Sequence, residues 1–151
     1  QYANLHDDPQ ALFYIPANVY IIGTMNDVDR SVDTFDFAMR RRFRFVEITP
    51  EQTMFMLQTK LEGKKLTNAK RRLRALNQQI EATAELDRRC AVGPSYFLKV
   101  ADLDGNWELL WEEFLGPLFV EYLRGTRDAE ATLSQLKVAY ELKYEKNADE
   151  S

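Results

Sequence analysis

Near the start of the chain, the apolar positions change from a strand pattern to a helix pattern and back. Residues 19–22 form an apolar run that is largely β-branched and too short for a helix with a face of its own. This run predicts a strand buried on both sides. A helix is expected at about residues 32–42 and a second strand at residues 43–48. Strand, helix and strand in this order form a βαβ unit, whose ligands bind at the carboxyl ends of the strands.

After residue 50, the apolar positions recur at helical spacing. Thr49 can be an N-cap, Pro50 suits the first helical position and Gln52 completes a capping box, so a helix is expected to begin here. Pro117 interrupts a later pattern and predicts a kink or break near Phe114. The expected inner faces of the helices are Met54, Leu57 and Leu61; Ala69, Leu73, Leu76, Ile80 and Ala84; Trp107, Leu110, Trp111, Phe114, Leu118 and Tyr122; and Leu133, Leu136 and Tyr140.

Residue types also suggest where these helices begin and end. The first is expected to stop at Gly63, the second to span about residues 68–86 and the last about residues 129–144. Either Asp104 or Asn106 can cap the third helix. The second part of the chain is therefore expected to be a helical bundle.

Composition and charge are those of an ordinary globular protein. The chain has 151 residues, of which 45% are hydrophobic and 29% charged. The net charge of −4 gives no whole-chain reason to expect binding to nucleic acid or a membrane.

We expect neither a membrane span nor a signal peptide, because the sequence has no run of about 18 apolar residues and no charged-then-apolar leader. The single cysteine, Cys90, excludes an internal disulfide and fits a reducing cytoplasm. Because the first residue is Gln1 rather than Met, we expect a piece of a longer protein.

Two linked motifs lie within residues 13–50. GTMNDVDRS occupies residues 23–31, and DFAMRRRF occupies residues 36–43. They resemble the McrB-type branch of the AAA+ NTPases, the motor subunits of modification-dependent restriction systems. In that family a strand ends in Met-Asn-x-x-Asp-Arg-Ser, and the next helix ends in Asp-x-Ala-Leu-Arg-Arg-Arg-Phe. Met39 stands in place of the leucine.

The resemblance implies the C-terminal half of an AAA+ module. The expected fold is mostly α with a small α/β remnant: a partial core of strand, helix and strand, followed by a bundle of lid helices. Residues 1–50 would belong to the core, residues 51–145 to the lid, and residues 146–151 to a frayed tail. The sequence has no GxxxxGK[ST] loop and no apolar run ending in Asp-Glu to hold magnesium. We therefore expect an open sheet that pairs with residues 12–15 or a second chain, and no hydrolysis by this chain alone.

The resemblance also assigns catalytic roles near the first motif pair. Asn26 would be the sensor residue, whose short amide can orient water or touch the γ-phosphate without adding charge. Arg41 and Arg42, followed by Arg40, are candidates for arginine fingers that reach the nucleotide of a neighbouring subunit, where lysine would lack the planar fork. The alternative is complementation of a helix dipole, worth about 0.3–1 kcal/mol per charge, which a single lysine would achieve. No metal-binding residue is expected.

A third motif, at residues 93–97, reads Gly-Pro-Ser-Tyr-Phe. The McrB-type family commonly has Gly-His-Ser-Tyr-Phe at a comparable place, in the lid near the nucleotide. Ser95 and Tyr96 are therefore expected at the nucleotide, whereas Pro94 replaces the histidine, so any imidazole role is lost or moved. The alternative is a plain turn in which Tyr96 and Phe97 belong to the core.

The resemblance implies several partners for the full-length protein. It would bind GTP or ATP with Mg²⁺, form a homo-oligomeric ring in the cytoplasm, and contact DNA through other domains. Asp29 and Arg30 would face a McrC-like stimulating or nuclease subunit.

A different function also fits the sequence: a helical protein-interaction or nucleic-acid-binding module without NTPase activity. Its basic residues would be those at 40–44 and the cluster Lys70, Arg71, Arg72 and Arg74. For this cluster we favour a solvated helix face, because no aromatic residues interleave with the charges.

Overall fold

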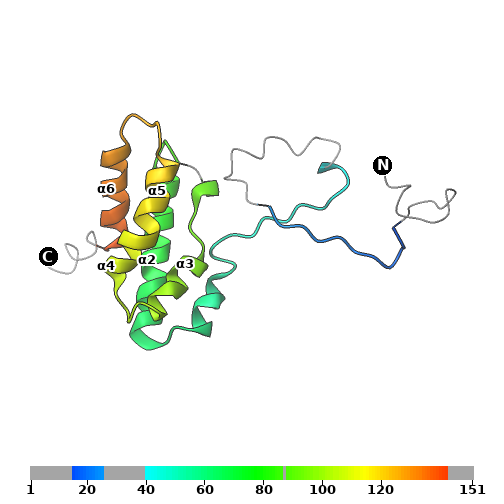
Figure 1. Cartoon of the computed structure of the whole chain (residues 1–151), viewed down its shortest axis with the longest axis horizontal. Coiled ribbons are helices and arrows are strands. Elements are labelled where there is room, and N and C mark those ends of the chain that lie inside the picture. Colours follow the sequence, from blue (N-terminus) through cyan, green and yellow to red (C-terminus); the bar gives the residue numbers. More distant parts are fainter. Residues whose placement is uncertain (1–14, 26–39, 87, 143–151) are drawn as a thin grey trace, which may run out of the picture.

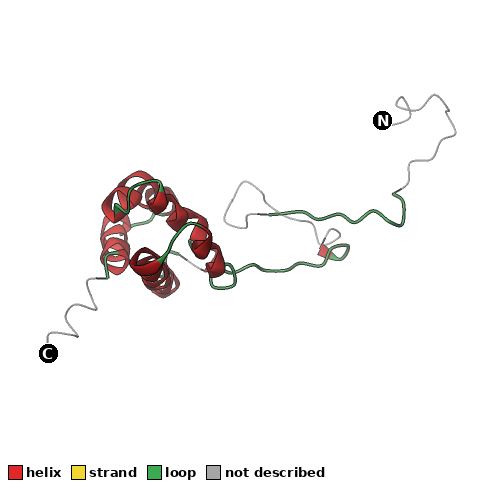
Figure 2. Cartoon of the chain, turned by 90° about the horizontal axis from the view of Figure 1, so that it is seen from below, coloured by secondary structure: helices red, strands yellow, loops and turns green. Residues whose placement is uncertain are grey.

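A helical body and an extended arm make up the part of the chain that the structure describes. The computed structural model describes residues 15–25, 40–86 and 88–142. The helical body comprises the described residues from 49 to 142, and the arm comprises residues 15–25 and 40–48. Figures 1 and 2 show the helices gathered in one cluster and the arm running away from it. The described residues contain helices and turns but no strand.

The helical body is built around its longest helix, α2 (Gly63–Ala82), which packs most extensively against α6 (Ala129–Tyr140). The remaining elements, in chain order, are η2 (Met54–Thr59) before α2, and then η3 (Arg88–Cys90), α3 (Pro94–Leu98), η4 (Lys99–Ala101), α4 (Trp107–Leu110), η5 (Trp111–Leu115) and α5 (Gly116–Tyr122) between α2 and α6. Side chains from η2, α2, α3, α4, η5, α5 and α6 meet in one apolar core. None of the helices that the structure describes combines the length and apolar character that a membrane span requires.

The inner face of α2 is largely as expected. Ala69, Leu73, Leu76 and Ile80 are all buried. The helix limits differ from the prediction, because α2 begins at Gly63 and ends at Ala82. Gly63 has a φ of +52°, which glycine adopts without steric cost, and it follows the turn out of η2. Since α2 ends before Ala84, that residue is exposed rather than on the inner face.

A kink or break is expected near Phe114, and the structure has a π-turn there instead of a break. Helix α4, the π-turn η5 and α5 follow one another without interruption from Trp107 to Tyr122. The N–H of Gly116 donates to the carbonyl oxygen of Trp111, five residues earlier, so the chain widens just before the proline. Asn106 caps α4 as expected, because its Oδ1 accepts a hydrogen bond from Leu109 N at 3.0 Å.

In the arm, the two segments expected as strands are extended and exposed. Residues 19–25 and 43–48 form no strand, and Ile22 and Ile48 are 92% and 72% exposed. A strand buried on both faces needs neighbouring strands for its backbone groups and covering layers for its side chains. The described residues supply neither, so the strand–helix–strand remnant is not seen in them. The helix expected at 32–42 lies mostly outside the described residues, as does most of the pairing segment 12–15.

Candidate functional site

The residues expected to face the phosphates are in or next to the arm. Asn26, Asp29 and Arg30 lie outside the described residues. Arg40, Arg41 and Arg42 are exposed, and the guanidinium carbon of Arg40 lies 5.6 Å from the centre of the Phe45 ring. The end of the arm at residues 40–42 lies away from the helical cluster (Figure 1). The structure therefore does not bring these arginines to the lid residues.

The residues expected near the nucleotide in the lid begin α3. Pro94 is at the start of the helix, after Gly93 in an extended conformation. Ser95 is exposed, whereas Tyr96 is half-buried against the core. Phe97 is fully buried, with its ring 6.1 Å from that of Tyr140. The core assignment is thus correct for Phe97 and partly for Tyr96, and Ser95 is the side chain most open to a ligand.

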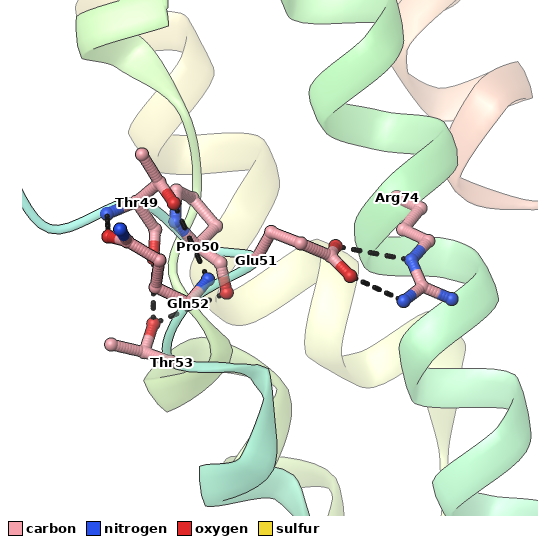
Figure 3. Close-up of polar contacts among 6 residues, drawn as sticks. All are labelled: Thr49, Pro50, Glu51, Gln52, Thr53 and Arg74. Atoms are coloured by element: carbon pink, nitrogen blue, oxygen red, sulfur yellow. Dashed lines mark hydrogen bonds and ion pairs between the residues drawn. The ribbon is translucent and has the colours of Figure 1, made fainter.

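The arm enters the helical body through a capping box (Figure 3). Thr49 N donates to Gln52 Oε1 at 2.9 Å, and Gln52 N donates to Thr49 Oγ1 at 3.4 Å. Thr53 Oγ1 donates to the carbonyl oxygens of Thr49 and Pro50, at 3.2 and 3.3 Å. The capping-box hydrogen bonds predicted at Thr49 are present, but they close a turn at residues 50–53, and the helix η2 begins only at Met54.

Two ion pairs hold this junction to the helices around it. Arg74 on α2 makes a bidentate contact with Glu51, with Nη2–Oε1 at 2.5 Å and Nε–Oε2 at 3.2 Å (Figure 3). This hydrogen bonding from Arg74 lowers the pKa of the Glu51 carboxyl, and Glu51 in turn raises the pKa of Arg74. In the arm, Glu47 pairs with Arg88 of η3 at 2.7 Å. All four side chains are largely exposed, so the pairs orient the junction more than they stabilise it.

An open pocket of about 300 Å³ lies at the junction. Residues 49–51 line one part of it, and α2 contributes Asn77, Gln78 and Glu81 among its other walls. The lining mixes two carboxylates, two carboxamides and the guanidinium of Arg74 with the apolar surface of Leu73. Such a surface can accept and donate hydrogen bonds to a polar ligand. Within the described ranges, no group of three or more His, Cys, Asp or Glu side chains is placed to hold a metal ion.

Sequence reasoning missed Asn77, which ties α2 to the start of α3. Its Nδ2 donates to Val92 O at 3.0 Å, and its Oδ1 accepts from Val92 N at 2.8 Å. The sequence did contain a signal: Asn77 has a low helix propensity and lies beside the buried stripe, between Leu73 and Ile80.

Sequence reasoning also placed Arg72 wrongly, on a solvated face. Its guanidinium carbon lies 5.0 Å from the ring centres of both Trp107 and Tyr140. Its Nη1 donates to Tyr140 O at 2.8 Å, and burial lowers its pKa. Since Arg74 is paired with Glu51, two of the four residues in the proposed nucleic-acid cluster are engaged within the protein.

Comparison with known proteins identifies the central part of the body. Residues 68–130 match the family model described as McrB, alpha-helical lid domain. This segment is similar to a McrB-type lid domain. It runs from within α2 to the start of α6 and includes Asn77, Ser95 and Tyr96, whereas the arm arginines lie outside it.

A curated relative agrees with this assignment. The chain is 39% identical over 97 residues to the protein of Escherichia coli (strain K12) named Type IV methyl-directed restriction enzyme EcoKMcrB subunit. The match covers 60% of this chain and 21% of that protein, so the chain matches about a fifth of its relative's length. No solved structure matches. The McrB-type resemblance read from residues 23–43 is thus confirmed by matches that include the lid.

Proposed function

We propose that this chain supplies the helical lid and part of the nucleotide-binding core of an AAA+ NTPase. In the longer protein it would hydrolyse GTP or ATP with Mg²⁺ and drive a modification-dependent restriction complex. The match of residues 68–130 to the McrB lid carries the proposal. Because the curated relative is named a methyl-directed restriction subunit, we propose DNA with methylated bases as the target of the whole assembly, recognised through other domains.

The exposed arm supports this assignment, because its side chains need a partner. Tyr20, Ile22 and Ile48 are 88%, 92% and 72% exposed, and large apolar side chains gathered in this way mark a surface that another element covers. The proposed cover is the rest of the AAA+ sheet, supplied by a longer polypeptide like the relative. Residues 19–25 and 43–48 would then pair on both edges, as the strand pattern of the sequence requires.

The proposed chemistry is phosphoryl transfer to water at an interface between subunits of a ring. Asn26 would orient the attacking water, and Arg41 and Arg42 would reach the γ-phosphate held by the neighbouring subunit. An arginine in this role is worth about 10³ to 10⁵ in rate, roughly 4 to 7 kcal/mol. Arg40 is the weaker candidate, because its guanidinium lies over the Phe45 ring.

In the same proposal the lid covers the nucleotide from α3. Ser95 and Tyr96 would face the nucleotide from the first turn of this helix. Ser95 is exposed and Tyr96 is half-buried, so the serine hydroxyl is the more accessible of the two. Asp29 and Arg30 would contact a McrC-like subunit, and the assembly would be cytoplasmic. The nucleic-acid alternative has less support, because Arg72 and Arg74 are engaged in internal contacts.

The test uses the longer protein that contains this chain. Its sequence should hold a phosphate loop roughly a hundred or more residues before Gln1, since an AAA+ core of ordinary domain size precedes the lid. In the purified protein, Arg42→Ala should lower kcat about 10³-fold or more, while nucleotide binding stays nearly unchanged. Arg44→Ala is the matched control, two positions further along the arm. Nucleotide binding is measured by fluorescence titration and hydrolysis by phosphate release.

Mixed rings decide whether the arginine acts across subunits. A phosphate-loop variant and Arg42→Ala are each inactive alone, but mixed rings recover activity where an intact arginine meets an intact nucleotide site. Equal loss of binding and hydrolysis in Arg42→Ala contradicts the trans-acting role. Detectable hydrolysis by the 151-residue chain alone contradicts the assignment of the chain as a lid with part of a core.

A further inference from the structure

The side chain of Asn77 makes both hydrogen bonds that a neighbouring strand would make with a single residue. Its amide group donates to Val92 O and accepts from Val92 N, at 3.0 and 2.8 Å. Asn77 and Val92 are 15 residues apart, and Val92 is buried with its side chain in the core. Because the backbone of Val92 is partly buried, the amide of Asn77 satisfies polar groups that water reaches poorly.

This contact fixes the point at which the chain turns into α3. Gly93, directly after Val92, is extended and provides no side-chain cap for the helix. Pro94 then begins α3, and Ser95 and Tyr96 follow in its first turn. The orientation of that turn therefore depends on the backbone of Val92, and so on the amide that holds it.

Asn77 also links α3 to the junction with the arm. It lines the same pocket as Thr49 and Pro50, the first residues after the arm, while its amide group holds Val92. A single side chain of α2 thus lines the pocket and also bonds to the backbone just before α3.

We infer that Asn77 is a positioning residue for nucleotide binding, acting through the backbone of Val92 on the first turn of α3. This inference rests on the proposed function, because it assigns the lid's contact with the nucleotide to that turn. Asn77 does not itself need to touch the nucleotide. It keeps Ser95 and Tyr96 in the orientation that binds, so its loss weakens binding more than it slows hydrolysis.

The first experiment measures the contact itself in the 151-residue chain. Asn77→Ala removes both hydrogen bonds, and Asn77→Asp keeps the shape but cannot donate to Val92 O when ionised. In Asn77→Ala, protection of the Val92 amide against hydrogen exchange should fall about tenfold or more. Asn77→Asp keeps an oxygen that can accept from Val92 N, so protection should fall less in that variant. Gln78→Ala, the exposed neighbour that lines the same pocket, should leave this protection unchanged. Unchanged protection in Asn77→Ala overturns the inference.

The second experiment measures nucleotide use in the longer protein. Asn77→Ala and Asn77→Asp should raise KM about tenfold with kcat within about threefold, as expected when binding common to ground state and transition state is lost. Thr126→Val is the structural control, because it removes a hydroxyl bonded to Leu123 O at 2.8 Å in the turn between α5 and α6. It should leave both constants unchanged.

The outcomes separate this inference from the function on which it rests. If the wild-type longer protein neither binds nor hydrolyses a nucleoside triphosphate, the proposed function fails and the inference fails with it. If the wild type is active and Asn77→Ala keeps a normal KM, only the inference fails. Equal KM increases in Asn77→Ala and Thr126→Val would mean general loss of lid stability, which also overturns the positioning role.

Discussion

The helical body and the arm contain the same kinds of apolar side chain, yet they place them in opposite environments. Ile80 on α2 is completely buried, whereas Ile22 in the arm is 92% exposed. A helix satisfies its backbone internally and needs only one covered face, which neighbouring helices of the same lid provide. A strand needs partners at both edges as well as covered faces. The helical body can therefore close its own core, whereas the described residues provide no such cover for the arm.

The largest expected effect comes from matched isoleucine substitutions in the two regions. Ile80→Ala should lower the free energy of unfolding by about 2–5 kcal/mol, because it leaves a cavity in the core. Ile22→Ala should change it by less than about 0.5 kcal/mol in the 151-residue chain. Urea unfolding followed by circular dichroism measures both. A large cost for Ile22→Ala in this chain would mean that the arm is already covered, contrary to the exposure seen here.

The same two isoleucine substitutions can be compared in the longer protein. If the arm pairs with an AAA+ sheet there, Ile22→Ala should cost about as much as other buried isoleucine truncations. An unchanged stability in that protein would contradict the proposed cover of the arm.

The residues that sequence patterns predicted correctly depend on local spacing. The capping box joins residues three positions apart, and the irregular π-turn before Pro117 lies where the proline lacks an N–H. Helical periodicity correctly predicts most of the buried face of α2, and Leu136 and Tyr140 of α6. Each of these features depends on residues that are only a few positions apart, so the local sequence is sufficient to predict it.

The features that sequence patterns missed depend on distant partners. Arg72 donates to a carbonyl 68 residues away, and Asn77 binds one 15 residues away. Neither pairing can be read from the charge or propensity of the residue itself. The two strands expected in the arm are not formed, for a related reason. Their apolar pattern is a local feature of the sequence, but a strand forms only beside another strand. For the same reason, the described residues place no phosphate-binding site beside Arg41 and Arg42.

A smaller effect is expected from two glycines, one in each region. A Cβ on Gly116 would lie 3.1 Å from Trp111 O and 3.3 Å from Trp111 Nε1, whereas a Cβ on Gly23 would meet nothing within 4 Å. Gly116→Ala should therefore cost about 1–3 kcal/mol by overpacking the π-turn, and Gly23→Ala should be nearly neutral. Thermal unfolding of the two variants tests this. Equal small effects would show that η5 adjusts to a methyl group.

The smallest expected effect lies at the junction between the two regions, in the ion pair of Glu51 with Arg74. Hydrogen bonding to Arg74 lowers the pKa of Glu51 below its usual value of 4.5. A lowered folded-state pKa means that the pair stabilises the protein above pH 4.5 and that this contribution disappears as pH falls through the folded-state pKa. Urea midpoints measured at pH 6 and pH 3 should therefore differ slightly more for the wild type than for Glu51→Gln. Because both side chains are largely exposed, high salt should remove most of that difference. A difference that persists in 1 M salt would mean that the junction is more enclosed than its exposure indicates.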